Sequence, residues 1–246
     1  MKVQAKVEWR SRPAVKADGV RIGKRALWLG LLLMQQDLVG AQVLQYQTMK
    51  GKIRIEGTSN LDDWQVESKS VRGDFEVPPE FPGVSAESHS ASQLAPRAEV
   101  FVEVRSLKSI EKDGKPFSNL MDEIMYEKLK AQETARIRYR LTNLKLSATP
   151  KTPEEPFRFE SKGELAVAGT TNQITMPISV LRLGEQGLRI WGNTAVRMTD
   201  FRIDPPAPKI ALGIVKTGDE VKISFDWVLT TSGHAHSAAG AATLPR

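Results

Sequence analysis

The chain has 246 residues, of which 40% are hydrophobic and 26% charged, so it can bury a sizeable core without disulfides or a structural metal. It contains no cysteine, which excludes thiol catalysis, cysteine-based zinc sites and lipid attachment through an N-terminal cysteine. Of the net charge of +6, residues 1–41 carry +5 (eight basic and three acidic residues), so the near-neutral remainder argues against a nucleic-acid partner.

The N-terminus has the pattern of an export signal. Lys24 and Arg25 precede the apolar run ALWLGLLLM, and the small residues Val39 and Ala41 stand before the expected cleavage point. The run is about half the ~20 residues that span a bilayer, so a permanent anchor is not expected. A buried helix of the folded domain is the alternative. The pattern predicts a signal peptide over residues 1–41 and a periplasmic or secreted protein.

Apolar residues beyond the signal alternate with period two, which is typical of strands with one apolar and one polar face. The predicted strands are residues 52–57, 71–77, 99–107, 136–146, 157–169, 173–183, 188–198 and 221–229. Gly169, followed by Thr-Thr-Asn, predicts a hairpin turn between two of them. Such strands, without a β-α-β rhythm, favour an antiparallel meander that closes into a barrel or packs as a sandwich.

One segment departs from this alternation. FSNLMDEIMYEKLKAQ spaces Leu120, Ile124 and Leu129 near the helical period, and Ser118 or Asn119 can cap its start. One short α-helix is therefore predicted among the strands.

Three segments lack strand or helix periodicity. Residues 77–97 and 147–156 are rich in proline and predict mobile connections. Residues 231–246 have low complexity and predict a disordered tail. The folded domain is thus predicted to span residues 42–230.

The sequence offers little for catalysis or metal binding. His89 falls in a predicted loop, and His234 and His236 fall in the predicted tail, so none lies on a strand beside an acid and a nucleophile. Two flexible histidines make a poor metal site. Asp62 and Asp63 are interpreted as an Asx-type turn. We therefore expect no enzyme, no metal and no cofactor.

A family resemblance begins at GTSNLDDWQVESKSVRGDFEV. This stretch resembles the start of the YceI-like domain, whose members include exported lipid- and polyisoprenoid-binding proteins. One branch reads Gly-Thr-Ser-Thr-Leu-His-Asp-Trp here, and Asp62 replaces its histidine. The matching residues are Gly57, Thr58, Ser59, Leu61, Asp63, Trp64 and Gly73. Four later segments resemble the family in order: VFVEVRSLKS, the Met-rich helix, GELAVAGTT and the closing VRMTDF stretch.

The resemblance implies an all-β fold, a lipocalin-like antiparallel eight-stranded β-barrel with one short α-helix. Trp64 is expected to cover one end of this barrel, with its indole N–H bonded to a turn carbonyl. A lipid or isoprenoid ligand would lie along inward-facing side chains. The predicted ligand-lining residues are Trp64, Val102, Ile137, Tyr139, Met198, Phe225 and Trp227.

The leading functional hypothesis is an exported binding protein that holds an amphiphilic lipid, such as a polyisoprenoid, in an apolar lumen. If the same side chains fill the interior, the alternative is a secreted interaction or stress-response module without a bound lipid. An enzyme on this scaffold would need a polar constellation inside the lumen. Transient membrane contact, and either a monomer or a homodimer, are left open.

Overall fold

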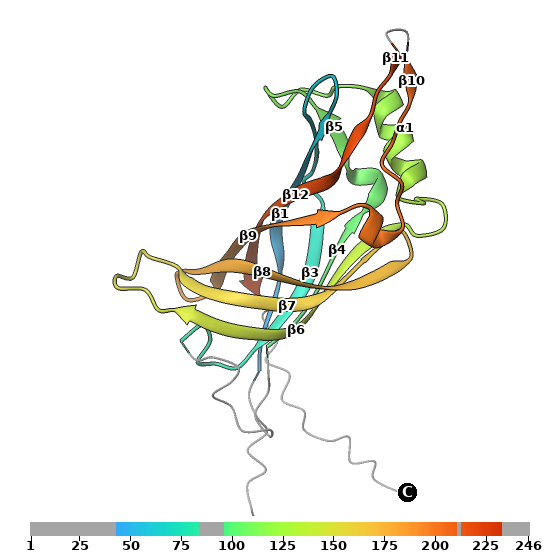
Figure 1. Ribbon diagram of the computed structural model, residues 1–246. Coiled ribbons are helices and arrows are strands. Elements are labelled where there is room, and N and C mark those ends of the chain that lie inside the picture. Colours follow the sequence, from blue (N-terminus) through green and yellow to red (C-terminus); the bar gives the residue numbers. More distant parts are fainter. Residues whose placement is uncertain (1–42, 84–95, 211–212, 233–246) are drawn as a thin grey trace, which may run out of the picture. The chain divides into compact units, whose positions relative to one another are not determined.

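The computed structural model describes residues 43–83, 96–210 and 213–232, which form a strand-rich domain with one α-helix (Figure 1). The elements are β1 (Leu44–Ser59), β2 (Trp64–Ser68), β3 (Val71–Val77), β4 (Arg97–Glu103), η2 (Val104–Ser106), β5 (Lys108–Ile110), α1 (Asn119–Lys128), β6 (Arg136–Ala148), β7 (Phe157–Val167), β8 (Thr170–Leu183), β9 (Gly187–Arg197), η3 (Thr199–Phe201), β10 (Lys209–Ile210), β11 (Gly213–Ile214) and β12 (Thr217–Thr231).

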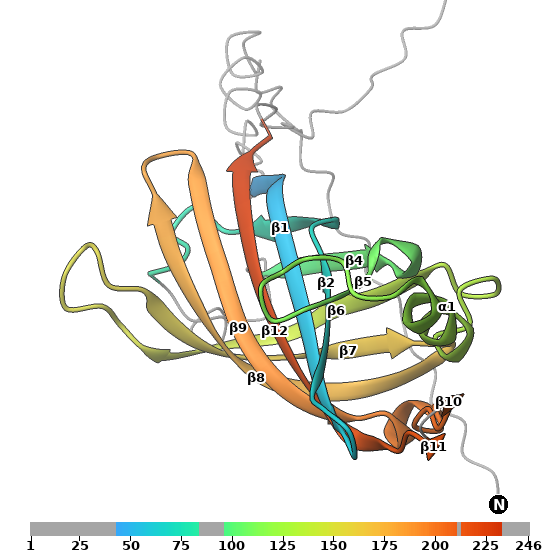
Figure 2. The same cartoon turned by 90° about the horizontal axis from the view of Figure 1, so that it is seen from above.

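The domain is a closed antiparallel barrel. Its strands follow the order β12-β9-β8-β7-β6-β4-β3-β1, and pairing of β1 with β12 closes the ring (Figures 1 and 2). These eight strands are the eight that apolar alternation predicted. The predicted eight-stranded barrel is therefore confirmed, and the sandwich alternative is wrong.

Strand β1 is long enough to pair with two successive strands on one side. Leu44–Gln47 pair with β3, and Ile53–Gly57 pair with β2, which in turn carries β5. Gly51 lies where the partner changes, and a Cβ there would stand 2.5 Å from the Val71 Cβ. Only glycine allows so close an approach of the two strands.

The predicted hairpin at Gly169 is present between β7 and β8. Ala168 has φ 50° and Gly169 has φ 82°, so both central residues of this two-residue loop are left-handed. Turns of this kind match the twist of the flanking strands, and glycine adopts positive φ without strain.

The predicted helix is also confirmed, and its most buried side chains are not those of its apolar stripe. Ser118 caps it by accepting a hydrogen bond from the Met121 N–H at 3.4 Å. Leu120, one of the apolar residues spaced near the helical period, is 63% exposed, whereas Asp122 and Tyr126 are buried. The Tyr126 hydroxyl donates to the Leu107 carbonyl at 2.7 Å, and polar bonds of this kind fix the rotation of the helix.

The first part of the predicted mobile loop 77–97 is packed into the core. Phe81 is only 2% exposed, and its ring stacks on Phe159 and meets Phe75 edge to face. The Arg182 guanidinium donates to the Phe81 carbonyl, which places this segment at the end of the barrel where β8 turns into β9. Residues 84–95 lie outside the described part of the chain.

A main apolar cluster fills much of the barrel interior, and two smaller clusters adjoin it. One of these gathers Leu165, Ala168, Phe201 and Ile203. The predicted signal peptide over 1–41 lies outside the described residues, as does the predicted tail from residue 233, while β12 extends to Thr231. No helix among the described residues is long and apolar enough to cross a bilayer.

Candidate functional site

The barrel lumen contains a cavity of about 120 Å³, and all eight barrel strands contribute to its lining. Among the described residues its walls are hydrocarbon side chains except at four: Tyr139 and Ser161 carry hydroxyls, Trp227 an indole N–H and Met176 a thioether sulfur. The remaining lining residues are Ile53, Val71, Phe75, Ala98, Val100, Val102, Ile137, Leu141, Leu144, Leu165, Ile178, Ile190 and Phe225. Such a lining suits an apolar ligand of limited size.

Five of the seven predicted ligand-lining residues lie at this cavity: Val102, Ile137, Tyr139, Phe225 and Trp227. Side chains alternate between the two faces of a strand, and each of these five residues lies at a position whose side chain faces the lumen. Prediction from sequence missed other inward residues, including Phe75, Ser161 and Met176, although the same alternation continued along their strands would have found them.

The other two predicted residues, Trp64 and Met198, do not line the cavity. Met198 packs against the smaller cluster around Leu165 and Phe201. Trp64 is half-buried at the start of β2, and its indole N–H donates at 3.2 Å to the carbonyl of Thr58, which lies in the last residues of β1 rather than in the turn. Whether any of the seven residues contacts a ligand remains a prediction.

The polar edge of Trp227 is bonded within the protein. Its indole N–H donates to the Thr48 hydroxyl at 2.8 Å, and that hydroxyl donates to the Gly73 carbonyl at 2.9 Å. Both protons in this series of hydrogen bonds therefore have an acceptor, and the Trp227 ring adds apolar surface to the cavity.

A hydroxyl pair, Tyr139 on β6 and Ser161 on β7, also faces the cavity. The two oxygens lie 2.6 Å apart. A Cβ at Gly163 would stand 2.4 Å from the Tyr139 Cζ, so this glycine makes room for the phenol ring. Burial raises the pKa of Tyr139, although the hydrogen bond to Ser161 partly offsets that rise. The phenol is therefore neutral at physiological pH.

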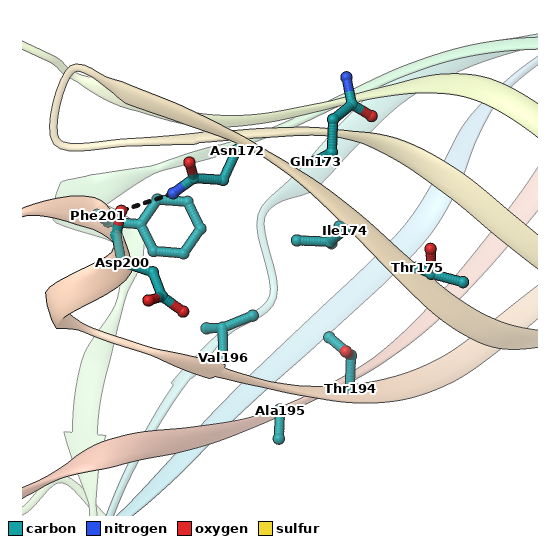
Figure 3. Close-up of a pocket in the computed structure, with 9 residues that line it drawn as sticks. All are labelled: Asn172, Gln173, Ile174, Thr175, Thr194, Ala195, Val196, Asp200 and Phe201. Atoms are coloured by element: carbon teal, nitrogen blue, oxygen red, sulfur yellow. Dashed lines mark hydrogen bonds between the residues drawn. The ribbon is translucent and has the colours of Figure 1, made fainter.

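A second hollow, of about 480 Å³, lies where β8 and β9 separate (Figure 3). Pairing between these strands ends at Ile178 and Gly192. Beyond that point Asn172 reaches across and donates its amide N–H to the Asp200 carbonyl at 2.6 Å, while Gln173 is directed away (Figure 3). The lining residues are Asn172, Gln173, Ile174, Thr175, Thr194, Ala195, Val196, Asp200 and Phe201. Amide and hydroxyl groups make this hollow far more polar than the lumen.

The two adjacent aspartates lie in the exposed turn between β1 and β2. The Ser59 hydroxyl accepts hydrogen bonds from the N–H groups of Leu61 and Asp62 in this turn, each at 3.2 Å, and the Asp62 carboxylate accepts one from the Asp63 N–H at 2.8 Å. The Asp62 carboxylate lies 3.6 Å from the Lys112 ammonium. No group of three metal-ligating side chains occurs among the described residues.

The fold and the apolar lumen define a lipocalin-like barrel. The model of the YceI-like domain matches residues 38–229 of this chain, which therefore belongs to the YceI-like family. The family resemblance noted in the sequence is confirmed. A search of curated protein sequences finds no significant match.

Two solved structures share the fold. One is a polyisoprenoid binding domain from Saccharophagus degradans implicated in plant cell wall breakdown, with a TM-score of 0.55, 9% identity, and coverage of 76% of this chain and 99% of that one. The other is Burkholderia cenocepacia BcnA, with a TM-score of 0.50, 15% identity, and coverage of 72% of this chain and 95% of that one. Identities this low establish a common fold alone.

Proposed function

We propose that this chain is an exported, non-enzymatic binding protein that holds the hydrocarbon part of an amphiphilic lipid, such as a polyisoprenoid, in its barrel lumen. The observation that carries the proposal is the cavity, because hydrocarbon lines it almost throughout. Burial of a ligand chain there would contribute roughly 0.8 kcal/mol per methylene before association costs. The solved polyisoprenoid binding domain with this fold supports the same ligand class.

The size of the cavity limits how a long chain can bind. Its volume of about 120 Å³ is smaller than the ~150 Å³ cavities that hold benzene, so it accepts roughly one isoprene unit as it stands. A longer chain requires the barrel to widen or the chain to leave the lumen. Several lining residues, among them Val100, Ile137 and Phe225, are only half-buried, which supports a lumen that opens to the outside.

The side chains that line the lumen do not favour catalysis at this site. None of the described residues around the lumen is an aspartate, a glutamate or a histidine. General acid–base catalysis in the lumen would therefore depend on Tyr139, and burial raises the pKa of its phenol further from neutrality.

The test is extraction of the full-length protein, purified from cells without detergent, with organic solvent followed by mass spectrometry. Wild-type protein is expected to release a defined lipid in near-stoichiometric amount. Ala98→Trp, which places a large ring in the lumen, is expected to release much less. Ala148→Trp, at the exposed end of β6, is the matched control and should behave as wild type.

Recovery of no lipid from any of the three proteins would contradict the proposal. Equal recovery from all three would place the lipid outside the lumen and would contradict it as well. Either result would favour the alternative, a secreted barrel that acts through its surface.

A further inference from the structure

Buried polar side chains in this barrel are few, and nearly all have complete hydrogen bonding. Among the described residues they are Ser68, Ser109, Asp122 and Ser161. The Ser109 hydroxyl donates to the Ser118 carbonyl at 2.9 Å, and Asp122 accepts from the Ser109 N–H at 2.7 Å. Buried polar groups are normally satisfied in this way, so an exception indicates a missing partner.

Ser68 shows what a complete hydroxyl pair looks like. Its oxygen lies 2.7 Å from that of Ser106, whose own proton goes to the Glu103 carbonyl at 2.6 Å. The Ser68 proton is then free to bond Ser106, so both protons of this pair have acceptors.

The pair formed by Tyr139 and Ser161 is incomplete. Two hydroxyls carry two protons, and one of them forms the 2.6 Å bond between the oxygens. Whichever residue donates, the other proton has no acceptor among the residues that the structure describes. Ser161 is 1% exposed, so this donor lies in the apolar cavity rather than in bulk solvent.

A water molecule is a poor partner for this donor. A buried water needs two to four polar partners. Among the described lining residues, the other polar groups are the indole N–H of Trp227, which is already bonded to Thr48, and the thioether sulfur of Met176, which is only a weak acceptor. A charged group is a poorer partner still, because none of the described residues that line the lumen is a lysine or an arginine that could offset the loss of its hydration.

We propose that the lumen is a subsite for a neutral oxygen, and that its ligand carries a ketone, ester or ether oxygen on the hydrocarbon that accepts a hydrogen bond from the pair Tyr139–Ser161. This inference rests on the proposed lipid-binding function and adds a selectivity to it. Plain hydrocarbon would leave the buried donor unpaired, and a carbonyl at the same depth pairs it. Any charged head group must therefore lie outside the lumen.

The experiment is a competition assay with the full chain, in which a ligand displaces a fluorescent apolar probe. Dodecyl methyl ketone is compared with its methylene analogue, in which a carbon replaces the carbonyl oxygen. The wild type is expected to bind the ketone about three- to tenfold more tightly, the effect of one neutral hydrogen bond.

Variants test which side chains cause the preference for the ketone. The double variant Tyr139→Phe/Ser161→Ala has no donor left, so the two ligands should bind equally. Each single variant keeps one hydroxyl proton and should retain part of the preference. Ser68→Ala removes a buried hydroxyl that does not line the cavity, so its preference should equal that of the wild type. Because the double variant removes both partners at once, its urea unfolding midpoint should stay close to that of the wild type.

Equal affinities of the wild type for ketone and methylene analogue would overturn this inference and leave the proposed function standing. A preference that survives in the double variant would overturn it too, because the donor would then lie elsewhere. If neither ligand displaces the probe, both the inference and the proposed function fail.

Discussion

Gly163 on β7 sets the position of the Tyr139 phenol. A Cβ at this residue would stand 2.4 Å from the Tyr139 Cζ and 2.5 Å from the Arg140 carbonyl oxygen. Gly163→Ala is therefore expected to lower the free energy of unfolding by about 1–3 kcal/mol, as overpacking usually does. Urea unfolding measures this loss. In a Tyr139→Ala background, Gly163→Ala should cost less stability, because the clash with the phenol ring is gone. If Gly163→Ala costs the same in both backgrounds, Gly163 does not make room for the Tyr139 ring.

The raised pKa of Tyr139 predicts an effect of alkaline pH on stability. Burial raises the pKa in the folded protein, so the folded state holds the phenol proton more tightly than the unfolded state. This contribution is fully present below the unfolded value of about 10 and is lost as the pH rises through the folded pKa.

Tyr139→Phe should consequently lose less stability than the wild type between neutral pH and pH of about 11, measured by urea unfolding at each pH. Some loss should remain, because burial also raises the pKa of Tyr46. Identical pH profiles for the two proteins would contradict a buried, proton-bearing Tyr139.

At the scale of single elements, α1 is held to the barrel by polar contacts. Asp122 accepts a hydrogen bond from the Ser109 N–H at 2.7 Å and lies 3.1 Å from the Lys108 ammonium. Asp122→Ala leaves the buried N–H unpaired and should cost about 1–3 kcal/mol of stability. Glu123→Ala, on the exposed side of the same helix, should change stability by less than about 0.5 kcal/mol. Equal effects in urea unfolding would mean that Asp122 does not anchor the helix.

Strand alternation predicted the eight barrel strands because inward and outward residues differ in polarity along each of them. The buried face of α1 could not be predicted in that way, since Asp122 and Tyr126 are buried through bonds to β5 and to the Leu107 carbonyl. Met198 lies outside the lumen for a different reason. Its alternation suggested the lumen, but the chain bends into η3 at Thr199 and the side chain packs in a separate cluster.

At the scale of the whole domain, Phe81 fills one end of the core. Its ring packs between Phe75 and Phe159 and is almost fully buried. Phe81→Ala should lower the free energy of unfolding by about 3–5 kcal/mol. Phe101, a half-buried ring on the outer side of β4 under the Arg136 guanidinium, is the matched control, and Phe101→Ala should cost clearly less. If urea unfolding shows that Phe81→Ala loses less stability than Phe101→Ala, the Phe81 ring does not close the end of the barrel.

The central claim is that apolar ligands bind inside the barrel. The most direct measurement is calorimetric titration of an apolar ligand about the size of one isoprene unit, such as 2-methyl-2-butene, into wild type, Ala98→Trp and Ala148→Trp. Ala98 lines the lumen, and Ala148 lies exposed at the end of β6. We expect saturable binding by the wild type and by Ala148→Trp, and binding at least tenfold weaker by Ala98→Trp, the equivalent of about 1.4 kcal/mol. Equal affinities for all three proteins would contradict a binding site in the lumen.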